Sequence, residues 1–306
     1  MKILVTGGSG LIGRALIKHL LADKWDVTSL TRNEINANKL LQKQLGKHAA
    51  EKVTWLQNLS SLSNLNDYDA VVNLAGEPIV AKRWSPTQKK VIENSRWLIT
   101  KQIADLINKS EQPPEVFVSG SAIGYYGRQK DQIIDESFDA VFPEFSHKLC
   151  AKWEYFANEA SEKTRVCLLR TGIVLAGNGG ALDKMLLPFK LGMGGPIGDG
   201  SHFMPWIHID DMVLGIMHLL NNTDARGAFN FTAPNPATNK EFSKTLASVL
   251  GRPAFLITPK IALKLLLGEM SDLLTHGQNV IPAKLEKTGY RFHYPELKPA
   301  LQSLNL

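Results

Sequence analysis

Cysteine, long apolar runs and clusters of basic residues are all scarce in this sequence. Its 306 residues include only two cysteines, Cys150 and Cys167, which favours a reducing cytoplasm over secretion with a disulfide framework. The N-terminal run MKILVTGGSG is too short for a signal peptide and is broken by glycines. The apolar stretch IALKLLLGEM is short and contains Lys264, so it predicts no membrane span. We therefore expect a cytoplasmic protein without a membrane partner.

The positive charge is spread along the chain. A formal net charge of +6 suits an anionic ligand, but lysine and arginine are scattered among acids and form no run. This pattern excludes nucleic acid as the expected partner. There is also no internal repeat or low-complexity tract, and the length predicts one large domain or two smaller ones.

The first 175 residues alternate short β-rich runs with longer helical patterns. KILVTG and DAVVNLAG are typical of buried strands, and TRVCLLRTGIVL is expected to be the sixth strand. This alternation predicts an α/β fold with a doubly wound parallel sheet. Glycine-rich excursions follow, and the strand and helix pattern then returns. We expect one domain from residues 1–175, completed by about 204–234, and a smaller C-terminal lobe from 176–203 and 235–306.

A glycine-rich turn, VTGGSGLIG, joins the first strand to the first helix. Gly7 would allow the sharp turn, Gly10 the close approach of a pyrophosphate, and Gly13 the close packing of helix and sheet. The free N–H groups and dipole of the helix would attract the pyrophosphate. We therefore expect Gly7, Ser9, Gly10 and Gly13 of this turn to bind a dinucleotide.

The end of the second strand indicates which dinucleotide binds. SLTRN places Thr31 and Arg32 where an acid would bind the ribose hydroxyls of NAD. An arginine can instead hold a 2′-phosphate with its planar fork. The sequence therefore favours NADP over NAD, and a solvated surface arginine is the alternative interpretation.

The turn after the fourth strand, NLAGEP, is a third expected cofactor contact. Leu74, Ala75 and Gly76 would border the adenosine side. Arg96, on the following helix, has the size and charge to reach the phosphates or a ribose, although helix arginines are often surface residues.

Together these motifs resemble the short-chain dehydrogenase/reductase superfamily, in its extended, epimerase-like branch. TGGSGLIG, NLAG, VSGSAIGYYG, LLRTGIVL and WIHIDDM occur in the expected order. NLAGEPI, HKLCAKWE, LGMGGPIGDG and PWIHIDDM are similar, more closely, to the atypical SDR39U1/YfcH-like subgroup. The resemblance implies a Rossmann-like fold with a substrate-side C-terminal lobe and an NADP cofactor. By position it implies cofactor contacts from Leu11 and Ile12, and nicotinamide-side contacts from the strand ends at Ser119, Arg170 and Ile173.

The resemblance also implies a catalytic tyrosine four residues before a lysine, on the helix in PEFSHKLCAKWEYF. Alignment on Glu154 puts Ser146 at the tyrosine position and Cys150 at the lysine position. Serine has neither the reach nor a usable pKa for this proton transfer, and cysteine cannot replace a cation. We therefore expect that the usual acid/base pair is absent.

Three side chains near the expected nicotinamide are candidate substitutes: Ser121, Tyr126 and His147, with Tyr126 the first candidate for the acid and His147 the second. Each has a structural alternative, because a strand-end serine can bond its own turn, a loop aromatic can pack, and a helix-start histidine can be solvated.

A metal site is not expected. In WIHIDDM, the residues His208, Asp210 and Asp211 are better explained by a strand end and an aspartate helix cap than by metal ligands. Both cysteines are interpreted as core residues.

Two functions remain open from the sequence. The first is an NADP-dependent oxidoreductase or epimerase with a substituted acid/base group, which the glycine-rich LGMGGPIGDG loop over a substrate cleft favours. The second is a non-catalytic NADP(H)-binding protein with a regulatory or redox-sensing role. A slow enzyme could survive loss of the pair, because general acid–base catalysis contributes about 10²–10⁴-fold. The substrate is not indicated, and a homodimer stays open.

Overall fold

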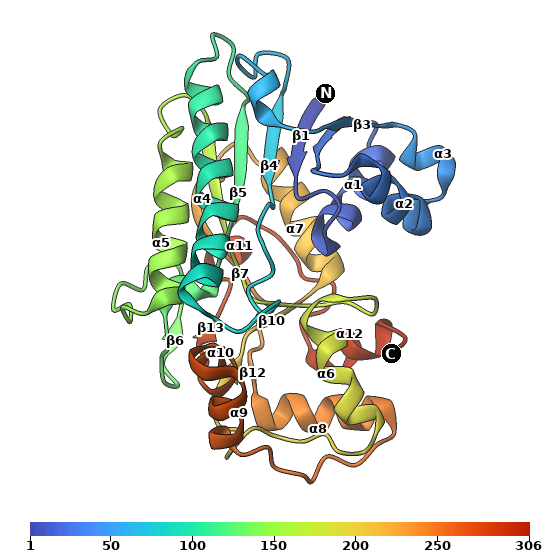
Figure 1. Ribbon diagram of the computed structural model, residues 1–306, viewed down its shortest axis with the longest axis vertical. Coiled ribbons are helices and arrows are strands. Elements are labelled where there is room, and N and C mark those ends of the chain that lie inside the picture. The colour runs from blue at the N-terminus through green and yellow to red at the C-terminus, as the bar shows by residue number, and fades with distance from the viewer.

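A seven-stranded parallel sheet forms the centre of the computed structural model, which describes all 306 residues (Figure 1). The strand order is β11-β7-β5-β4-β1-β2-β3. Because β2 and β4 lie on opposite sides of β1, the sheet order reverses there, and ligands of such sheets bind at the carboxyl ends beside this reversal. The strands are β1 (Lys2–Thr6), β2 (Asp26–Leu30), β3 (Val53–Leu56), β4 (Ala70–Asn73), β5 (Val116–Ala122), β7 (Arg165–Thr171) and β11 (Gly227–Phe231).

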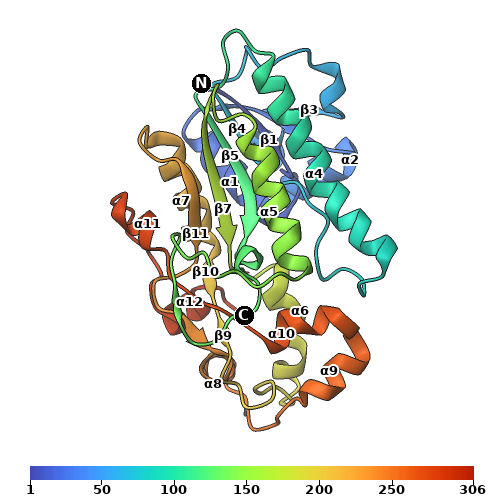
Figure 2. The ribbon, with the colours of Figure 1, turned by 90° about the vertical axis from the view of Figure 1, so that its left-hand side faces the viewer.

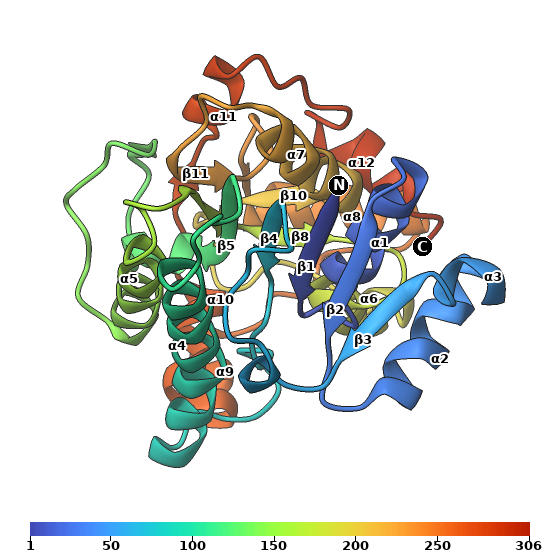
Figure 3. The ribbon, with the colours of Figure 1, turned by 90° about the horizontal axis from the view of Figure 1, so that it is seen from above.

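Helices cover both faces of the sheet. In Figure 2, α4 and α5 lie in front of the strands, and Figure 3 shows α1 and α7 on the opposite face. Along β1, Ile3 and Val5 pack into the α1–α7 layer, whereas Leu4 packs into the α4–α5 layer. This alternation with both faces buried explains the continuous apolar run. The helices are α1 (Leu11–Ala22), α2 (Glu34–Leu45), α3 (Lys47–Ala50), α4 (Pro86–Asn108), α5 (Phe145–Asn158) and α7 (Ile209–Asn221).

The predicted α/β fold class is therefore confirmed, and a smaller lobe lies below the carboxyl ends of the strands (Figure 1). Its own core includes Trp206, Phe242 and Leu301. The helices of this part are α6 (Gly180–Lys190), α8 (Asn239–Leu250), α9 (Lys260–Leu267), α10 (Asp272–Thr275) and α12 (Leu297–Ser303), whereas α11 (Ala283–Lys287) packs against the edge strand β11 of the main sheet. Three two-stranded sheets pair β10 (Trp206–His208) with β8 (Ile173–Leu175), β12 (Ala237–Thr238) with β9 (Phe203–Met204), and β13 (Asn279–Val280) with β6 (Ile133–Ile134).

The expected sixth strand is in fact two strands. β7 ends at Thr171, and β8 begins at Ile173 and pairs with β10 outside the main sheet. Gly172 is the break, where an added Cβ would lie 2.6 Å from the carbonyl oxygen of Pro205. The prediction of one continuous strand was wrong because the chain before β10 passes too close to this point for any side chain.

The expected aspartate cap of α7 was also wrong. His208 is the N-cap, and its Nδ1 accepts a hydrogen bond from the Asp210 N–H at 3.1 Å. Asp211 is fully buried and accepts from the Tyr290 hydroxyl and from the backbone N–H groups of His293 and Tyr294. These residues therefore anchor the C-terminal segment. No group of three or more His, Cys, Asp or Glu side chains is arranged to hold a metal ion.

None of the helices combines the length and the apolarity that crossing a membrane requires.

Candidate functional site

The glycine turn after β1 is pressed against the turn after β4. Gly7 has a φ of +70°, and a Cβ added there would lie 2.5 Å from the carbonyl oxygen of Leu74. A Cβ on Gly13 would lie 2.3 Å from the carbonyl oxygen of Gly7. Both positions therefore require glycine, the first for backbone conformation and both for space. The first turn of α1 is in this way held directly beside the loop that contains Leu74.

The N-terminus of α1 is open to an anion. Gly10 is its N-cap, no side chain caps the helix, and its first turn contains no acid. The backbone N–H groups of Leu11 and Ile12 therefore start a helix whose dipole lacks an internal counter-charge. Ser9 is held in place by its carbonyl oxygen, which accepts a hydrogen bond of 2.6 Å from Arg14 Nη1. This arrangement fits a pyrophosphate.

Arg32 lies two residues beyond β2 and is exposed, and it forms no ion pair or hydrogen bond within the chain. The neighbouring Thr31 is buried, and its hydroxyl bonds locally to Asn33. Because β2 is adjacent to β1, the free guanidinium lies on the β2 side of the open end of α1. It can meet a 2′-phosphate without first breaking a protein contact.

Buried polar side chains fix the carboxyl ends of β1, β4 and β5. Asn73 accepts from the Thr6 hydroxyl at 2.6 Å and donates to the Thr100 hydroxyl on α4 at 2.8 Å. Trp153 of α5 donates to the same hydroxyl at 2.8 Å. Ser119 is fully buried beside Asn73, so its side chain belongs to this network rather than to an open surface. The network makes the floor of the site rigid.

A buried ion pair lies under the nicotinamide end that the resemblance implies. Glu154 of α5 accepts two hydrogen bonds of 2.9 Å from Arg170 of β7, in a bidentate arrangement. The Ser121 hydroxyl of β5 donates to the same carboxylate at 2.7 Å. Hydrogen bonds and charge from Glu154 raise the pKa of Arg170, although burial opposes this effect. The side chains of Ser121 and Arg170, both predicted site residues, are thus already hydrogen-bonded to Glu154.

Tyr126 extends the same network. It is fully buried, and its hydroxyl donates to Asn230 Oδ1 at 2.7 Å and accepts from Arg170 Nη1 at 3.1 Å. Burial raises the pKa of Tyr126 to about 12, against the opposing effect of Arg170. A phenol with these partners is poorly placed to meet a substrate oxygen, and the geometry favours a structural role.

Ser146 and Cys150 occupy adjacent turns of α5, and both are buried. The Ser146 hydroxyl donates to Glu144 Oε1 at 2.8 Å, and burial raises the pKa of the Cys150 thiol to about 12. Gly124 backs both residues, since an added Cβ would lie 3.1 Å from Ser146 Cβ and 3.5 Å from Cys150 Sγ. Neither side chain is an acid or a cation at neutral pH.

His147 is the predicted proton-transfer residue that remains accessible. It is half-buried on α5, and its Nδ1 hydrogen-bonds the carbonyl oxygen of Tyr125. Because a carbonyl only accepts, Nδ1 carries the proton and Nε2 is left as the free acceptor of the neutral ring. The Tyr125 ring in turn lies 3.5 Å from the Arg170 guanidinium carbon. His147 thus adjoins the Glu154–Arg170 pair through one residue.

Glu154, Asn73 and Thr100 organise the site, and sequence reasoning assigned them no role. Their signal is a polar residue on an otherwise apolar face, for instance Asn73 at the end of the buried strand AVVN. Ile173, also predicted as a contact, is half-buried in β8 opposite Trp206.

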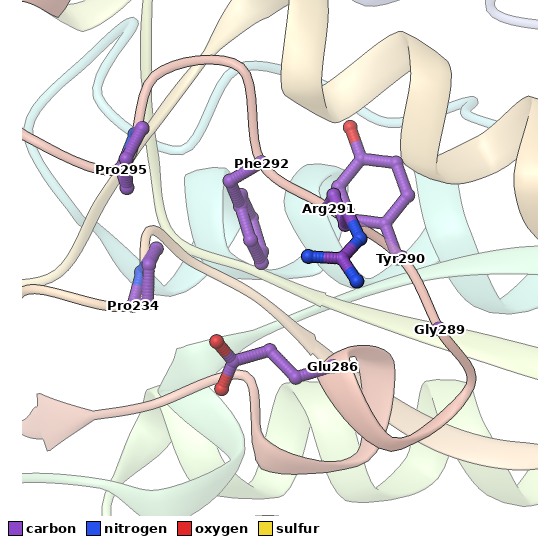
Figure 4. A pocket seen from close by; sticks show the side chains of 7 residues that line it. All are labelled: Pro234, Glu286, Gly289, Tyr290, Arg291, Phe292 and Pro295. Carbon is purple, nitrogen blue, oxygen red and sulfur yellow. The ribbon is translucent and has the colours of Figure 1, made fainter.

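A surface hollow of about 520 Å³ lies elsewhere, between the end of β11 and the segment after α11. Figure 4 shows the Phe292 and Arg291 side chains directed into the space between Pro234 and Glu286. None of the predicted site residues lines this hollow. The candidate site described above therefore lies apart from this hollow.

Comparison with known proteins decides the family. A family model described as NAD dependent epimerase/dehydratase family matches residues 3–231. The chain belongs to this family. A second model, a domain of unknown function called DUF1731, matches residues 258–304. The predicted resemblance to the extended branch and its SDR39U1-like subgroup is confirmed.

Relatives in this family match nearly the whole chain. The chain is 38% identical to the human epimerase family protein SDR39U1, over 99% of both chains. It is 39% identical to the chloroplastic SDR39U1 homolog of Arabidopsis thaliana, over 99% of this chain and 86% of that protein. The crystal structure of human SDR39U1 (isoform 2) with NADPH superposes with a TM-score of 0.89 at 37% identity, covering 99% of both chains. A UDP-glucuronic acid 4-epimerase of Bacillus cereus, at 17% identity and a TM-score of 0.79, shares the fold.

Proposed function

We propose that this family member is an NADP(H)-binding atypical short-chain dehydrogenase/reductase, acting as an oxidoreductase or epimerase on a small molecule. The observation that carries the proposal is the likeness to human SDR39U1, which was crystallised with NADPH and has a TM-score of 0.89 to this chain. The open N-terminus of α1 and the free Arg32 side chain fit the pyrophosphate and the 2′-phosphate of this cofactor.

The residues of the chain would bind and orient the reactants. When bound, the nicotinamide supplies or accepts a hydride at a carbon of the substrate. The turn from Gly7 to Gly13 holds the pyrophosphate, Arg32 holds the 2′-phosphate, and the loop from Leu74 to Gly76 borders the cofactor. The buried hydrogen-bond networks around Asn73 and Glu154 hold these elements in fixed relative positions. Orienting the cofactor and the substrate in this way would lower the barrier to hydride transfer.

A proton must accompany the hydride, because reduction of a carbonyl forms a C–H bond at carbon and an O–H bond at oxygen. We favour His147 over Tyr126 as its donor, since His147 Nε2 is free and the Tyr126 hydroxyl already has three partners, at Asn230, Asp135 and Arg170. Protonated His147 would give the proton to the oxygen in reduction, and neutral His147 would take it in oxidation.

Cofactor choice is the first test. We expect NADPH to bind about ten- to a hundredfold more tightly than NADH, because a charge-assisted phosphate contact is worth about 1.5–3 kcal/mol. Arg32→Ala should remove most of this preference, whereas Arg252→Ala, at an exposed arginine after α8, should not. Fluorescence titration of both nucleotides measures the difference. Equal affinities in the unmutated protein would disprove the NADP assignment.

The proton donor is the second test, assayed as NADPH oxidation with a broad panel of carbonyl compounds. His147→Ala should lower turnover by about 10²-fold or more, with NADPH affinity within a few fold. Tyr126→Phe, Ser146→Ala and Cys150→Ala should each keep turnover within about tenfold. Lys148→Ala, next to His147 and exposed, is the control. Turnover that survives His147→Ala but is lost in Tyr126→Phe would reverse the assignment.

A non-catalytic NADP(H)-binding protein is the second candidate function. The observation that favours it is the chemistry of α5, where Ser146 and Cys150 supply neither acid nor cation. Tight NADPH binding by the unmutated chain, without turnover of any compound in the panel, would support this alternative and count against an enzyme.

A further inference from the structure

Arg96 of α4 is a cation without an anion in a mostly enclosed position. Burial lowers its pKa, so the folded chain bears a cost for keeping this charge. Its only hydrogen bonds run from Nη1 to the Ile92 carbonyl and the Ser95 hydroxyl, at 3.2 and 3.3 Å. Glu77 and Cys150 act on it through space, but Arg96 pairs with no carboxylate. The N–H groups on Nε and Nη2 have no acceptor in the protein.

Two surfaces lie close to the guanidinium. A Cβ added to Gly76 would lie 3.0 Å from Arg96 Cζ and 3.2 Å from each Nη atom. Arg96 Cζ also lies 5.2 Å from the centre of the Trp153 ring of α5. The loop after β4 and helix α5 therefore clamp the side chain. Contacts of this kind restrict the free N–H groups before any ligand arrives.

The helix contacts place this cation beside Cys150. Trp97 donates to the Leu149 carbonyl at 3.0 Å, and Trp153 donates to the Thr100 hydroxyl at 2.8 Å. Along α5 these bonds lie on either side of Cys150, and along α4 the first of them is made by the residue next to Arg96. Arg96 is also close enough to Cys150 to oppose the rise of its pKa. The charge that α5 lacks at Cys150 is thus present on α4.

The strand order decides which part of a dinucleotide lies here. β4 and β5 are on the side of β1 opposite to β2, so Arg32 and Arg96 lie at opposite ends of the site. The adenosine 2′-phosphate at Arg32 and the pyrophosphate at α1 leave the other half of the nucleotide for the β4–β5 edge. Its phosphate and ribose oxygens are acceptors that suit an arginine fork.

Resting on the NADP(H) binding proposed above, we infer that Arg96 is a positioning residue that binds the phosphate or ribose oxygens of the nicotinamide half. It supplies from α4 the positive charge that α5 lacks at Cys150. Unlike a lysine, a guanidinium is not deprotonated at any ordinary pH, so it cannot act as a general acid or base. Arg96 would therefore bind the cofactor without taking part in proton transfer.

The test compares NADPH with 2′,5′-ADP, which keeps the adenosine and the 2′-phosphate but lacks the nicotinamide half. Arg96→Ala should weaken NADPH binding about tenfold or more and change 2′,5′-ADP binding less than twofold. Arg32→Ala should weaken both ligands. Arg96→Lys should recover part of the lost NADPH affinity, because charge returns without the fork.

A second variant displaces the guanidinium without deleting it. In Gly76→Ala the added Cβ meets Arg96 at 3.0 Å, so this variant should also weaken NADPH selectively. An Arg96→Ala protein that binds NADPH as the unmutated chain does, or that loses both ligands equally, would overturn the inference. A failure of the proposed function gives a different result, because in that case the unmutated chain itself would bind no NADPH.

Discussion

Three buried hydrogen bonds converge on the carboxylate of Glu154. Its carboxylate accepts from Arg170 twice and from Ser121 once, and only 6% of the residue is exposed. Arg170 also donates to the Tyr126 hydroxyl, which in turn donates to Asn230 on the edge strand β11. One carboxylate therefore joins α5 to three strands through direct and shared bonds. A buried charge in such a position is costly to leave unpaired.

We expect Glu154→Gln to destabilise the protein by about 3–5 kcal/mol, because Arg170 would keep its charge without a counter-ion. Urea denaturation of both proteins at pH 7 measures this. Glu159→Gln is the control: this residue follows α5 and forms only an exposed contact with Lys101, so its loss should cost less than about 1 kcal/mol. A Glu154→Gln protein as stable as the control variant would show that the pair contributes nothing net.

At the scale of elements, the segment before β9 contains a histidine that burial holds neutral. Burial lowers the pKa of His202 to about 4, and the nearby positive charge of Lys260 adds to this effect, while Asp199 opposes it. The Nδ1 atom of His202 is buried and has no hydrogen-bond partner. His202 also positions α8 through its carbonyl, which accepts from the Asn239 N–H at 2.8 Å. Protonation of this ring must therefore favour the unfolded chain.

The sign of the pH dependence follows. The unfolded histidine has a pKa near 6.5 and the folded one a pKa of about 4, so stability is complete above pH 6.5 and falls as the pH drops towards 4. The loss from this group is about 1–3 kcal/mol. Urea midpoints at pH 7 and pH 4.5 should differ less in His202→Gln than in the unmutated protein. An identical pH dependence in both proteins would contradict the prediction.

The elements that the sequence predicted well are those with a periodic pattern. Buried runs such as KILVT and AVVN became β1 and β4, because strands covered on both faces need apolar residues throughout. The split at Gly172 was missed because it depends on the Pro205 carbonyl, which is distant in sequence. The α7 cap was missed because a histidine side chain took the place that the neighbouring aspartates were expected to fill.

The site was predicted less completely than the fold, for a related reason. Glycines and Arg32 adjoin their own strands, so their positions follow from local sequence. The partners of Arg170, Tyr126 and Ser121 lie on other elements, up to 104 residues away in the case of Tyr126 and Asn230. No local pattern shows that these side chains are already bonded to one another. The same limit hid the clamp around Arg96, whose two surfaces come from a loop and a second helix.

At the scale of the whole molecule, the C-terminal part is interleaved with the sheet. β11 forms one edge of the main sheet, β13 pairs with β6, and α12 packs in the cluster that contains Trp206. Figure 1 shows these late segments beside elements from the middle of the chain. In two of the three small sheets, the paired strands are separated in the chain by a strand of the main sheet. β11 lies between β9 and β12, and both β7 and β11 lie between β6 and β13. The lobes therefore share hydrogen bonds, and we expect them to lose structure together.

The anchoring of Asp211 has a consequence for the time at which the protein becomes native. Its carboxylate accepts hydrogen bonds from the N–H groups of His293 and Tyr294, which are synthesised 82 and 83 residues later. At about 5–20 residues per second, a ribosome needs about 4–17 s to add them. During that interval α7 can form, but the Asp211 carboxylate lacks its partners, so we expect α7 to pack firmly only after His293 and Tyr294 have been added. A chain that terminates before these residues should leave a buried carboxylate unpaired, which destabilises the packing of α7.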